Sequence, residues 1–218
     1  MRYSNQSALN VLTSLTTSST IIHDVQLMRE AGLATIGYFY ADFRDQAKHS
    51  TRGLLTSLLV QLCIQSDNLC EILNSLYSAH DRGLQQPSDD ALTDCLKEML
   101  TLPGYGPFYI IIDALDEYPN SHGFPSPREQ ALEVVKDIMD LELPHLRICI
   151  TSLPEIDIRT TLASSANHFV SLHEEIGQNK DIADYVEAIV NSDSFMREWP
   201  DEDKRLVINT LAENGGGM

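Results

Sequence analysis

The sequence has few basic residues, no long apolar run and no secretory leader. Lys and Arg number 15 against 32 Asp and Glu, which gives a formal net charge of −17. A surface of that sign repels phosphate groups, so we expect no binding to nucleic acid or to an anionic membrane. No apolar stretch approaches the roughly 20 residues that span a bilayer. The amino terminus also lacks the cationic segment and apolar core of a signal peptide.

Cysteine forms no pattern typical of a metal site. The sequence contains four cysteines: Cys63, Cys70, Cys95 and Cys149. They make no C-x-x-C pair and no spacing typical of zinc ligands. Each lies among apolar residues, which predicts buried free thiols in a reducing compartment. We therefore expect a cytoplasmic protein.

Three short segments rich in apolar residues predict β-strands. They are TIGYFYADF (Thr35–Phe43), FYIIID (Phe108–Asp113) and LRICITS (Leu146–Ser152), with HFVSL (His168–Leu172) as a weaker fourth segment. Their nearly continuous apolar character is typical of strands that are buried on both faces of a parallel sheet.

Between and after these segments, apolar residues recur with helical spacing. Leucine stripes predict helices over residues 54–62 and 69–77, and two more helices are expected over residues 182–190 and 201–213. Strands that alternate with helices indicate an α/β layer fold with right-handed crossovers.

Two further helices are predicted from their start signals. One begins near Ser88, which is followed by two aspartates in the first turn. The other begins at the sequence SPRE. There Ser126 is the expected N-cap, Pro127 the first helical residue and Glu129 the closing residue of a capping box.

An acidic cluster follows the most apolar of the predicted strands. That strand ends in Asp113, and Asp116 and Glu117 come three and four residues later. Ligands of open parallel sheets bind beyond the carboxyl ends of the strands, and Mg²⁺ at phosphate sites is held by one or two carboxylates. We interpret Asp113 as a metal ligand, and Asp116 and Glu117 as catalytic acids that position the attacking water. The alternative is a solvated acidic loop without chemistry.

The segment FYIIIDALDEYPN resembles the Walker B region of NACHT-type signal-transduction (STAND) NTPases, in particular the fungal branch related to the nephrocystin amino-terminal domain. Other segments resemble this family in the same order: YFYADFRD, LLTSLLVQL, LYSAHDRGLQQPSDDALTDCLKEML, RICITSLPEIDIRTTL and DIADYVEAIV. The resemblance runs from about residue 20 onward. It implies a P-loop NTPase fold, which is a three-layer α/β sandwich with a mostly parallel central sheet and a helical C-terminal end. It also implies that ATP or GTP binds with Mg²⁺ and is hydrolysed slowly as a switch.

The sequence departs from this family where the phosphates would bind. The family has a G-x-x-x-x-G-K-[ST] loop before its first helix, and the loop amides and the lysine hold the phosphates. This chain has no glycine before Gly32 and no lysine before Lys48, so we assign no nucleotide-binding residue. The second departure is Leu153 in TSLPE, where the family usually has an arginine that senses the terminal phosphate.

These departures weaken nucleotide binding. A hydrogen bond to a charged group is worth about 1.5–3 kcal/mol, so the loss of the lysine and of two or three loop amides costs roughly 5–8 kcal/mol. About 1.4 kcal/mol corresponds to a tenfold change in affinity, so a micromolar site becomes weaker than millimolar. We therefore expect negligible hydrolysis.

The sequence leaves three functional interpretations open. The first is a NACHT-like domain of a signal-transduction NTPase that retains Walker B and lacks Walker A. The second is a non-catalytic scaffold, a pseudo-NTPase that binds other protein domains or copies of the same family. The third is an unrelated Mg²⁺-dependent phosphate enzyme that uses the acids alone. Its candidate cation is Arg44, for which a structural ion pair is the competing role.

On the basis of the resemblance and the predicted helices, we divide the chain into three parts. Residues 1–19 form a degenerate or mis-delimited start, where the phosphate loop is expected. Residues 20–176 form the NACHT-like core, and residues 177–218 form C-terminal helices that we expect to be truncated. The closing sequence ENGGGM carries a helix-ending glycine signal.

Overall fold

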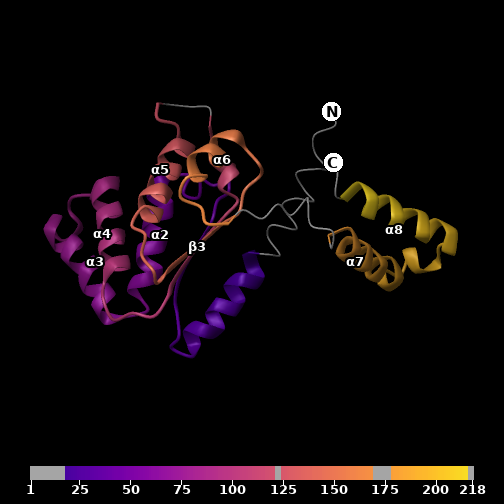
Figure 1. Ribbon diagram of the computed structural model, residues 1–218, viewed down its shortest axis with the longest axis horizontal. Helices are drawn as coiled ribbons and strands as arrows, with labels where there is room; N and C mark the ends of the chain where they lie inside the picture. Colours follow the sequence, from indigo (N-terminus) through magenta and orange to yellow (C-terminus); the bar gives the residue numbers. More distant parts are fainter. Residues whose placement is uncertain (1–17, 121–123, 169–177, 216–218) are drawn as a thin grey trace. The chain divides into compact units, whose positions relative to one another are not determined.

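The structure is a computed structural model that describes residues 18–120, 124–168 and 178–215. The chain divides between Ala166 and Asn167 into two compact units. One unit contains the sheet and the acidic cluster, and the other contains the last two long helices (Figure 1).

Three parallel strands form a sheet in the order β1–β2–β3. They span Thr35–Tyr40 (β1), Phe108–Asp113 (β2) and Leu146–Ile150 (β3). The three predicted strands and their parallel arrangement are confirmed. β1 ends three residues earlier than predicted and β3 two residues earlier, because the chain turns at their carboxyl ends into loops that contact the acidic cluster. The weaker fourth candidate, over residues 168–172, lies outside the described residues apart from His168.

Helices connect and cover the strands. Besides a helix over residues 18–30, they are α2 (Thr51–Cys63), α3 (Asp67–Ala79), α4 (Asp89–Thr101), α5 (Pro127–Met139) and α6 (Ile156–Leu162). Single 3₁₀ turns are η1 (Asp81–Gly83) and η2 (Leu115–Glu117). The helices predicted from the leucine stripes are confirmed. α6 was not predicted, because its seven residues are too few to display a helical repeat.

Both predicted helix starts are confirmed in atomic detail. The Ser88 hydroxyl accepts a hydrogen bond from the amide of Ala91 at the start of α4. At α5 the Ser126 hydroxyl accepts from the amide of Glu129, and the Glu129 carboxylate accepts from the amide of Ser126 at 2.7 Å. This reciprocal pair is the capping box that the sequence SPRE predicts.

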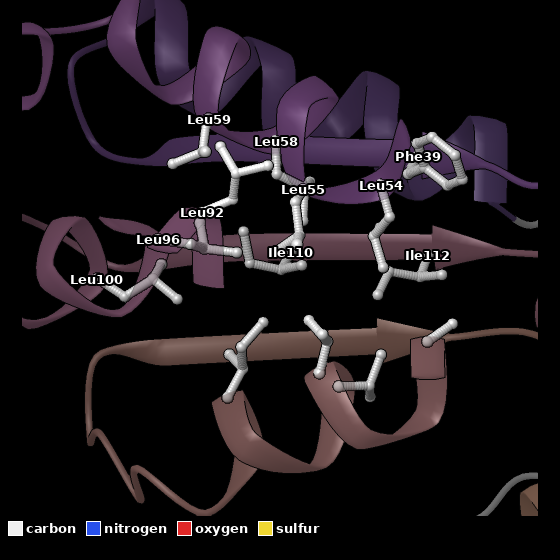
Figure 2. Packing of buried hydrophobic residues seen from close by; sticks show 14 of the residues in the cluster. Phe39, Leu54, Leu55, Leu58, Leu59, Leu92, Leu96, Leu100, Ile110 and Ile112 are labelled. Atoms are coloured by element: carbon white, nitrogen blue, oxygen red, sulfur yellow. The ribbon is translucent and has the colours of Figure 1, made fainter. Parts of the chain in front are cut away.

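Alternating residues of β2 pack into two separate apolar clusters, so helices lie on both faces of the sheet. Ile110 and Ile112 belong to the larger cluster, which includes the buried stripes of α2, α4 and α5. Figure 2 shows this side, with Leu54, Leu55, Leu58 and Leu59 of α2 and Leu92, Leu96 and Leu100 of α4 packed towards the strand. Ile111 points the other way, to Ile22 and Val25 of the helix over residues 18–30. The described core is therefore an α/β/α arrangement.

Two glutamine side chains cover the outer edge of β1. The amide group of Gln65 accepts from the Ile36 amide and donates to the Ile36 carbonyl, at 3.1 and 2.6 Å. Gln61 does the same for Tyr38, at 3.1 and 2.7 Å. Four backbone groups that would otherwise face solvent or another strand are thereby paired with side chains of α2 and of the turn that follows it. An edge strand that is covered in this way is protected from edge-to-edge association.

The second unit is a pair of helices, α7 (Gln178–Ser192) and α8 (Asp201–Gly215), joined through the 3₁₀ turn η3 (Met196–Glu198). Both predicted helices are confirmed. Val190 is 2% exposed, whereas several large apolar side chains of this unit are exposed: Tyr185, Phe195, Leu206 and Leu211.

Among the helices of the described ranges, none combines the length with the apolar character that crossing a bilayer requires.

Candidate functional site

Three elements bring polar side chains together at the carboxyl end of β2. Asp113, the last residue of β2, is 1% exposed. Its Oδ1 accepts a hydrogen bond of 2.5 Å from the hydroxyl of Ser18, which lies in the helix over residues 18–30. The same oxygen accepts a second hydrogen bond from the hydroxyl of Thr151, directly after β3. Two hydroxyl donors therefore hold the carboxyl group that the sequence assigns to a metal.

The backbone turns sharply as it leaves Asp113. Ala114 has φ 57° and ψ 48°, the left-handed region that costs a non-glycine residue roughly 1–2 kcal/mol. The Ala114 amide donates to the Thr151 hydroxyl at 3.0 Å, and the Leu115 amide donates to the Thr151 carbonyl at 3.0 Å. Thr151 thus fixes both the carboxyl group and the turn that follows it. The turn leads directly into η2, which carries Asp116 and Glu117.

The side chain of Asp116 accepts a hydrogen bond from the protein backbone. Its Oδ1 accepts from the amide of Leu153 at 2.9 Å. Leu153 occupies the position at which the family that this sequence resembles usually has an arginine. Its side chain offers no donor, but its backbone amide fixes Asp116. This contact joins the loop after β2 to the loop after β3.

Glu117, the last residue of η2, contacts the loop after β1. Its Oε2 accepts from the amide of Phe43 at 3.4 Å. Burial raises the pKa of Glu117, and the charges of Asp116 and Asp42 raise it further, against the opposing effects of the Phe43 amide and Arg44. A carboxyl group in this environment favours its protonated form relative to an exposed glutamate.

Arg128, which the sequence analysis did not single out, organises the loops around these acids. It lies in the first turn of α5 and is 8% exposed. Its guanidinium donates to the carbonyls of Tyr118 at 3.0 Å and Asp116 at 2.6 Å. It also donates to the Asp157 carboxylate at 3.3 Å and lies 4.0 Å from that of Glu155. Arg128 lies inside the predicted capping box, next to an acidic loop, and this position was the sequence signal that could have identified it.

Arg44, the cation that the third interpretation requires, is occupied by an acid. Its Nε lies 2.9 Å from Oδ1 of Asp42 and its Nη2 lies 3.0 Å from Oδ2. The hydrogen bond with Arg44 lowers the pKa of Asp42 to about 2. The pairing confirms that a structural ion pair is formed at this position.

The charges of the described residues at this edge do not favour a magnesium–nucleotide complex. Within the described ranges, no three His, Cys, Asp or Glu side chains come together closely enough to hold a metal ion. Asp113 and a serine hydroxyl are the kind of donors that a P-loop protein uses for Mg²⁺. Here the hydroxyl of Ser18 donates to the carboxyl group itself. Around them lie Asp42, Asp116 and Glu117, which repel phosphate, and the described arginines of this edge, Arg44 and Arg128, are paired.

The structure thus defines an α/β protein with a parallel sheet and a group of acids at its carboxyl edge. The family profile described as "Nephrocystin 3, N-terminal" matches residues 14–152, which is more than half of the chain. The chain belongs to this family. No curated protein and no solved structure gives a match. The matched range includes Ser18, Asp113 and Thr151, so the hydrogen-bonded centre lies inside the family region.

Proposed function

We propose that this chain is a NACHT-like domain of the STAND class, in which the P-loop sandwich and the Walker B strand persist and nucleotide hydrolysis is lost. Membership of the nephrocystin-like family supports the class. The parallel sheet, with helices on both faces and an aspartate at the end of a buried strand, supports the P-loop ancestry. By resemblance the ancestral ligand is ATP or GTP with Mg²⁺.

The observation that carries the loss of hydrolysis is the bonding of the acids within the protein. Asp113 accepts from Ser18 and Thr151, and Asp116 accepts from the amide of Leu153. These hydrogen bonds give the acids a structural role, because they join the ends of β2 and β3 and the helix over residues 18–30. The absence of any glycine before Gly32 and of any lysine before Lys48 supports the same conclusion.

The function that this arrangement favours is that of a scaffold, which acts through contacts with other protein domains or with copies of the same family. A scaffold requires a stable sheet and loops held in one geometry, and internal bonds between strand ends provide that. The net charge of −17 argues against nucleic acid as a partner. A cytoplasmic location fits the free thiols.

Calorimetric titration of the whole chain with Mg²⁺-ATP and with Mg²⁺-GTP, up to millimolar nucleotide, tests the proposal. We expect no saturable heat and no phosphate release. Asp113→Asn is the matched variant, because its side-chain oxygen still accepts from the two hydroxyls while the charge is removed. Saturable binding by the wild-type chain that disappears in Asp113→Asn would show that a nucleotide site is present.

Sedimentation velocity at several protein concentrations examines the scaffold function. We expect any self-association to be the same with and without Mg²⁺-ATP, because the proposal gives nucleotide no role. Assembly that appears only with nucleotide would identify a working switch and would reject the scaffold.

A further inference from the structure

Two of the four cysteines touch each other. All four are free, as predicted, but only Cys95 is fully buried; Cys63, Cys70 and Cys149 are partly exposed. The sulfur atoms of Cys63 and Cys70 lie 2.9 Å apart. A disulfide bond is about 2.05 Å long, and sulfur atoms that are not bonded normally stay farther apart than these two. The pair is therefore close to bonding geometry while both thiols remain accessible in part.

The ends of two adjacent helices hold the two cysteines in contact. Cys63 is the last residue of α2, and Cys70 lies in the first turn of α3. Ser66 lies between them, and its amide donates to the Cys63 carbonyl while its carbonyl accepts from the Cys70 amide at 3.0 Å. Leu62 and Leu69, each next to one cysteine, are both 0% exposed and anchor the two helices in the core. The short connection leaves the thiols little freedom to separate.

We propose that Cys63 and Cys70 are a redox modification site, which a hydroperoxide such as H₂O₂ converts into a disulfide that joins α2 to α3. This site is separate from the acidic cluster and does not depend on the proposed loss of hydrolysis.

The chemistry requires no cofactor. The Cys70 thiolate attacks one peroxide oxygen, the O–O bond breaks, and the departing hydroxide takes up a proton to give water and a Cys70 sulfenic acid. The Cys63 sulfur then attacks the Cys70 sulfur, the S–O bond breaks and the S–S bond forms, and a second water leaves with the Cys63 proton. The two thiols lose two electrons and two protons, and H₂O₂ becomes two molecules of water.

The order of attack follows from the environment of Cys63. Burial raises the pKa of Cys63 to about 11, and the neighbouring Cys70 thiol contributes to the shift. In the observed contact the Cys63 thiol donates its proton to the Cys70 sulfur, so Cys63 suits the second, resolving step, in which its partner is already held beside it.

The disulfide would stabilise the turn whose side chains bind the outer edge of β1. Gln61 and Gln65, two residues before and two after Cys63, hold the outer edge of β1. The hydroxyl of Ser66 is hydrogen-bonded to that of Tyr105, in the loop before β2. A covalent link between Cys63 and Cys70 fixes the turn that carries these contacts, so oxidation is expected to slow the opening of the β1 edge.

Mass spectrometry of the folded chain tests the proposal, because trypsin isolates the pair. Arg52 and Arg82 are consecutive cleavage sites, and the peptide over residues 53–82 contains Cys63 and Cys70 and no other cysteine. After H₂O₂ treatment and alkylation of the remaining thiols, we expect this peptide to be unalkylated and two hydrogen atoms lighter than its reduced form. Dithiothreitol is expected to restore alkylation at both cysteines.

Variants and amide exchange complete the test. Cys63→Ser and Cys70→Ser are expected to abolish the light peptide, and Cys149→Ser, the matched control, is expected to retain it. In the oxidised wild-type chain, the amides of Ile36 and Tyr38 are expected to exchange several-fold more slowly than in the reduced chain. Alkylation of both cysteines after treatment, sulfinic acid at one of them, or a link between two chains would overturn the proposed site. Unchanged exchange at both amides would overturn its effect on β1.

Discussion

Ser18 and Asp113, 95 residues apart in the sequence, are joined by a hydrogen bond of 2.5 Å in which the serine hydroxyl donates to the carboxyl group. Both side chains are almost completely buried, at 0% and 1% exposure. A buried carboxylate is tolerated only where donors replace the water that it has lost. The Ser18 hydroxyl, together with that of Thr151, allows the acid to lie beneath the helix over residues 18–30.

Ser18→Ala is therefore expected to destabilise the chain. The loss of a hydrogen bond to a buried charged group costs about 1.5–3 kcal/mol. Unfolding in urea, followed by circular dichroism, measures the difference. Ser19→Ala is the matched control, since Ser19 is exposed on the same turn. Equal stability of the two variants would mean that Ser18 contributes nothing to holding Asp113.

Arg128→Met is expected to be among the most damaging substitutions in the described chain. It removes the guanidinium donor from the carbonyls of Asp116 and Tyr118, and it leaves the Asp157 carboxylate with the Asn120 amide as a donor. Breaking a buried charged network in this way costs about 3–5 kcal/mol. Arg128→Lys restores the charge but not the planar fork, so it is expected to recover only part of the loss.

Urea unfolding measures both variants against Arg147→Met. Arg147 is exposed on β3 and donates to carbonyls at the surface, so its loss is expected to stay within about 0.5 kcal/mol. If Arg128→Met cost no more than Arg147→Met, the loops after β2 and β3 would not depend on the guanidinium.

The raised pKa of Glu117 predicts how stability varies with pH. Burial is its first cause, and Asp116 and Asp42 add to it. Because the folded chain binds this proton more tightly than the unfolded chain does, stability falls as pH rises from the ordinary glutamate value through the raised one. Glu117→Gln removes this slope. The variant is expected to melt at a higher temperature than wild type above that window and at a similar temperature below it.

Thermal melts between about pH 4 and pH 8 cover this window. Glu133→Gln, at an exposed position on α5, is the control and is expected to follow the wild-type profile. The titration of Asp42 changes stability in the opposite direction to that of Glu117, and it does so at lower pH. Its pKa is lowered to about 2, so its contribution is present above the ordinary aspartate value and is lost as pH falls towards 2. A Glu117→Gln profile parallel to wild type throughout would contradict the raised pKa.

Much of the fold was predictable because local rules and tertiary structure agree. The run Phe108–Asp113 forms a strand buried on both faces, and the sequence SPRE forms the capping box at Ser126. In both cases the signal lies within a few adjacent residues. The predicted ends of β1 and β3 were less accurate, because the strand ends depend on contacts with residues far away in the sequence.

The candidate site was predictable only in its residue types. Asp113 could be placed at a strand end from the sequence, but its bonds to Ser18 and Thr151 join residues 95 and 38 positions away. The sequence alone offered no means of showing that these two hydroxyls would bind the carboxyl group. Arg128 was missed for the same reason, since its partners lie in the segment after β2 and in the first turn of α6.

The glutamine cover of β1 predicts a change in association. Gln65→Leu removes the two hydrogen bonds that pair the amide and carbonyl of Ile36. Those backbone groups then become available to the edge of another chain. We expect increased self-association, measured by light scattering after gel filtration. Gln85→Leu, at an exposed position where the side chain donates to Asp81, is the control. A monomeric Gln65→Leu chain of wild-type stability would show that the edge needs no cover.

Gly53→Ala is expected to destabilise the chain although it replaces glycine within a helix. In an open helix this change stabilises by up to about 1 kcal/mol. Here an added Cβ would lie 1.7 Å from the carbonyl oxygen of Ala47, a backbone atom that cannot rotate away. The first turn of α2 would have to shift, and with it the hydrogen bond from the Gly53 amide to the Ser50 cap. Such overpacking costs about 1–3 kcal/mol.

The sign of the change in unfolding free energy on Gly53→Ala tests this prediction, because helix propensity predicts a gain in stability and steric overlap predicts a loss. Urea unfolding measures it against Thr56→Ala, an exposed position on the same helix that is expected to change stability by less than about 0.5 kcal/mol. A stabilised Gly53→Ala chain would mean that the loop before α2 moves freely. That loop includes Phe43, whose amide binds Glu117. Its freedom would then be expected to weaken this contact, which lowers the pKa of Glu117, and so to raise that pKa further above its ordinary value, so the two measurements check each other.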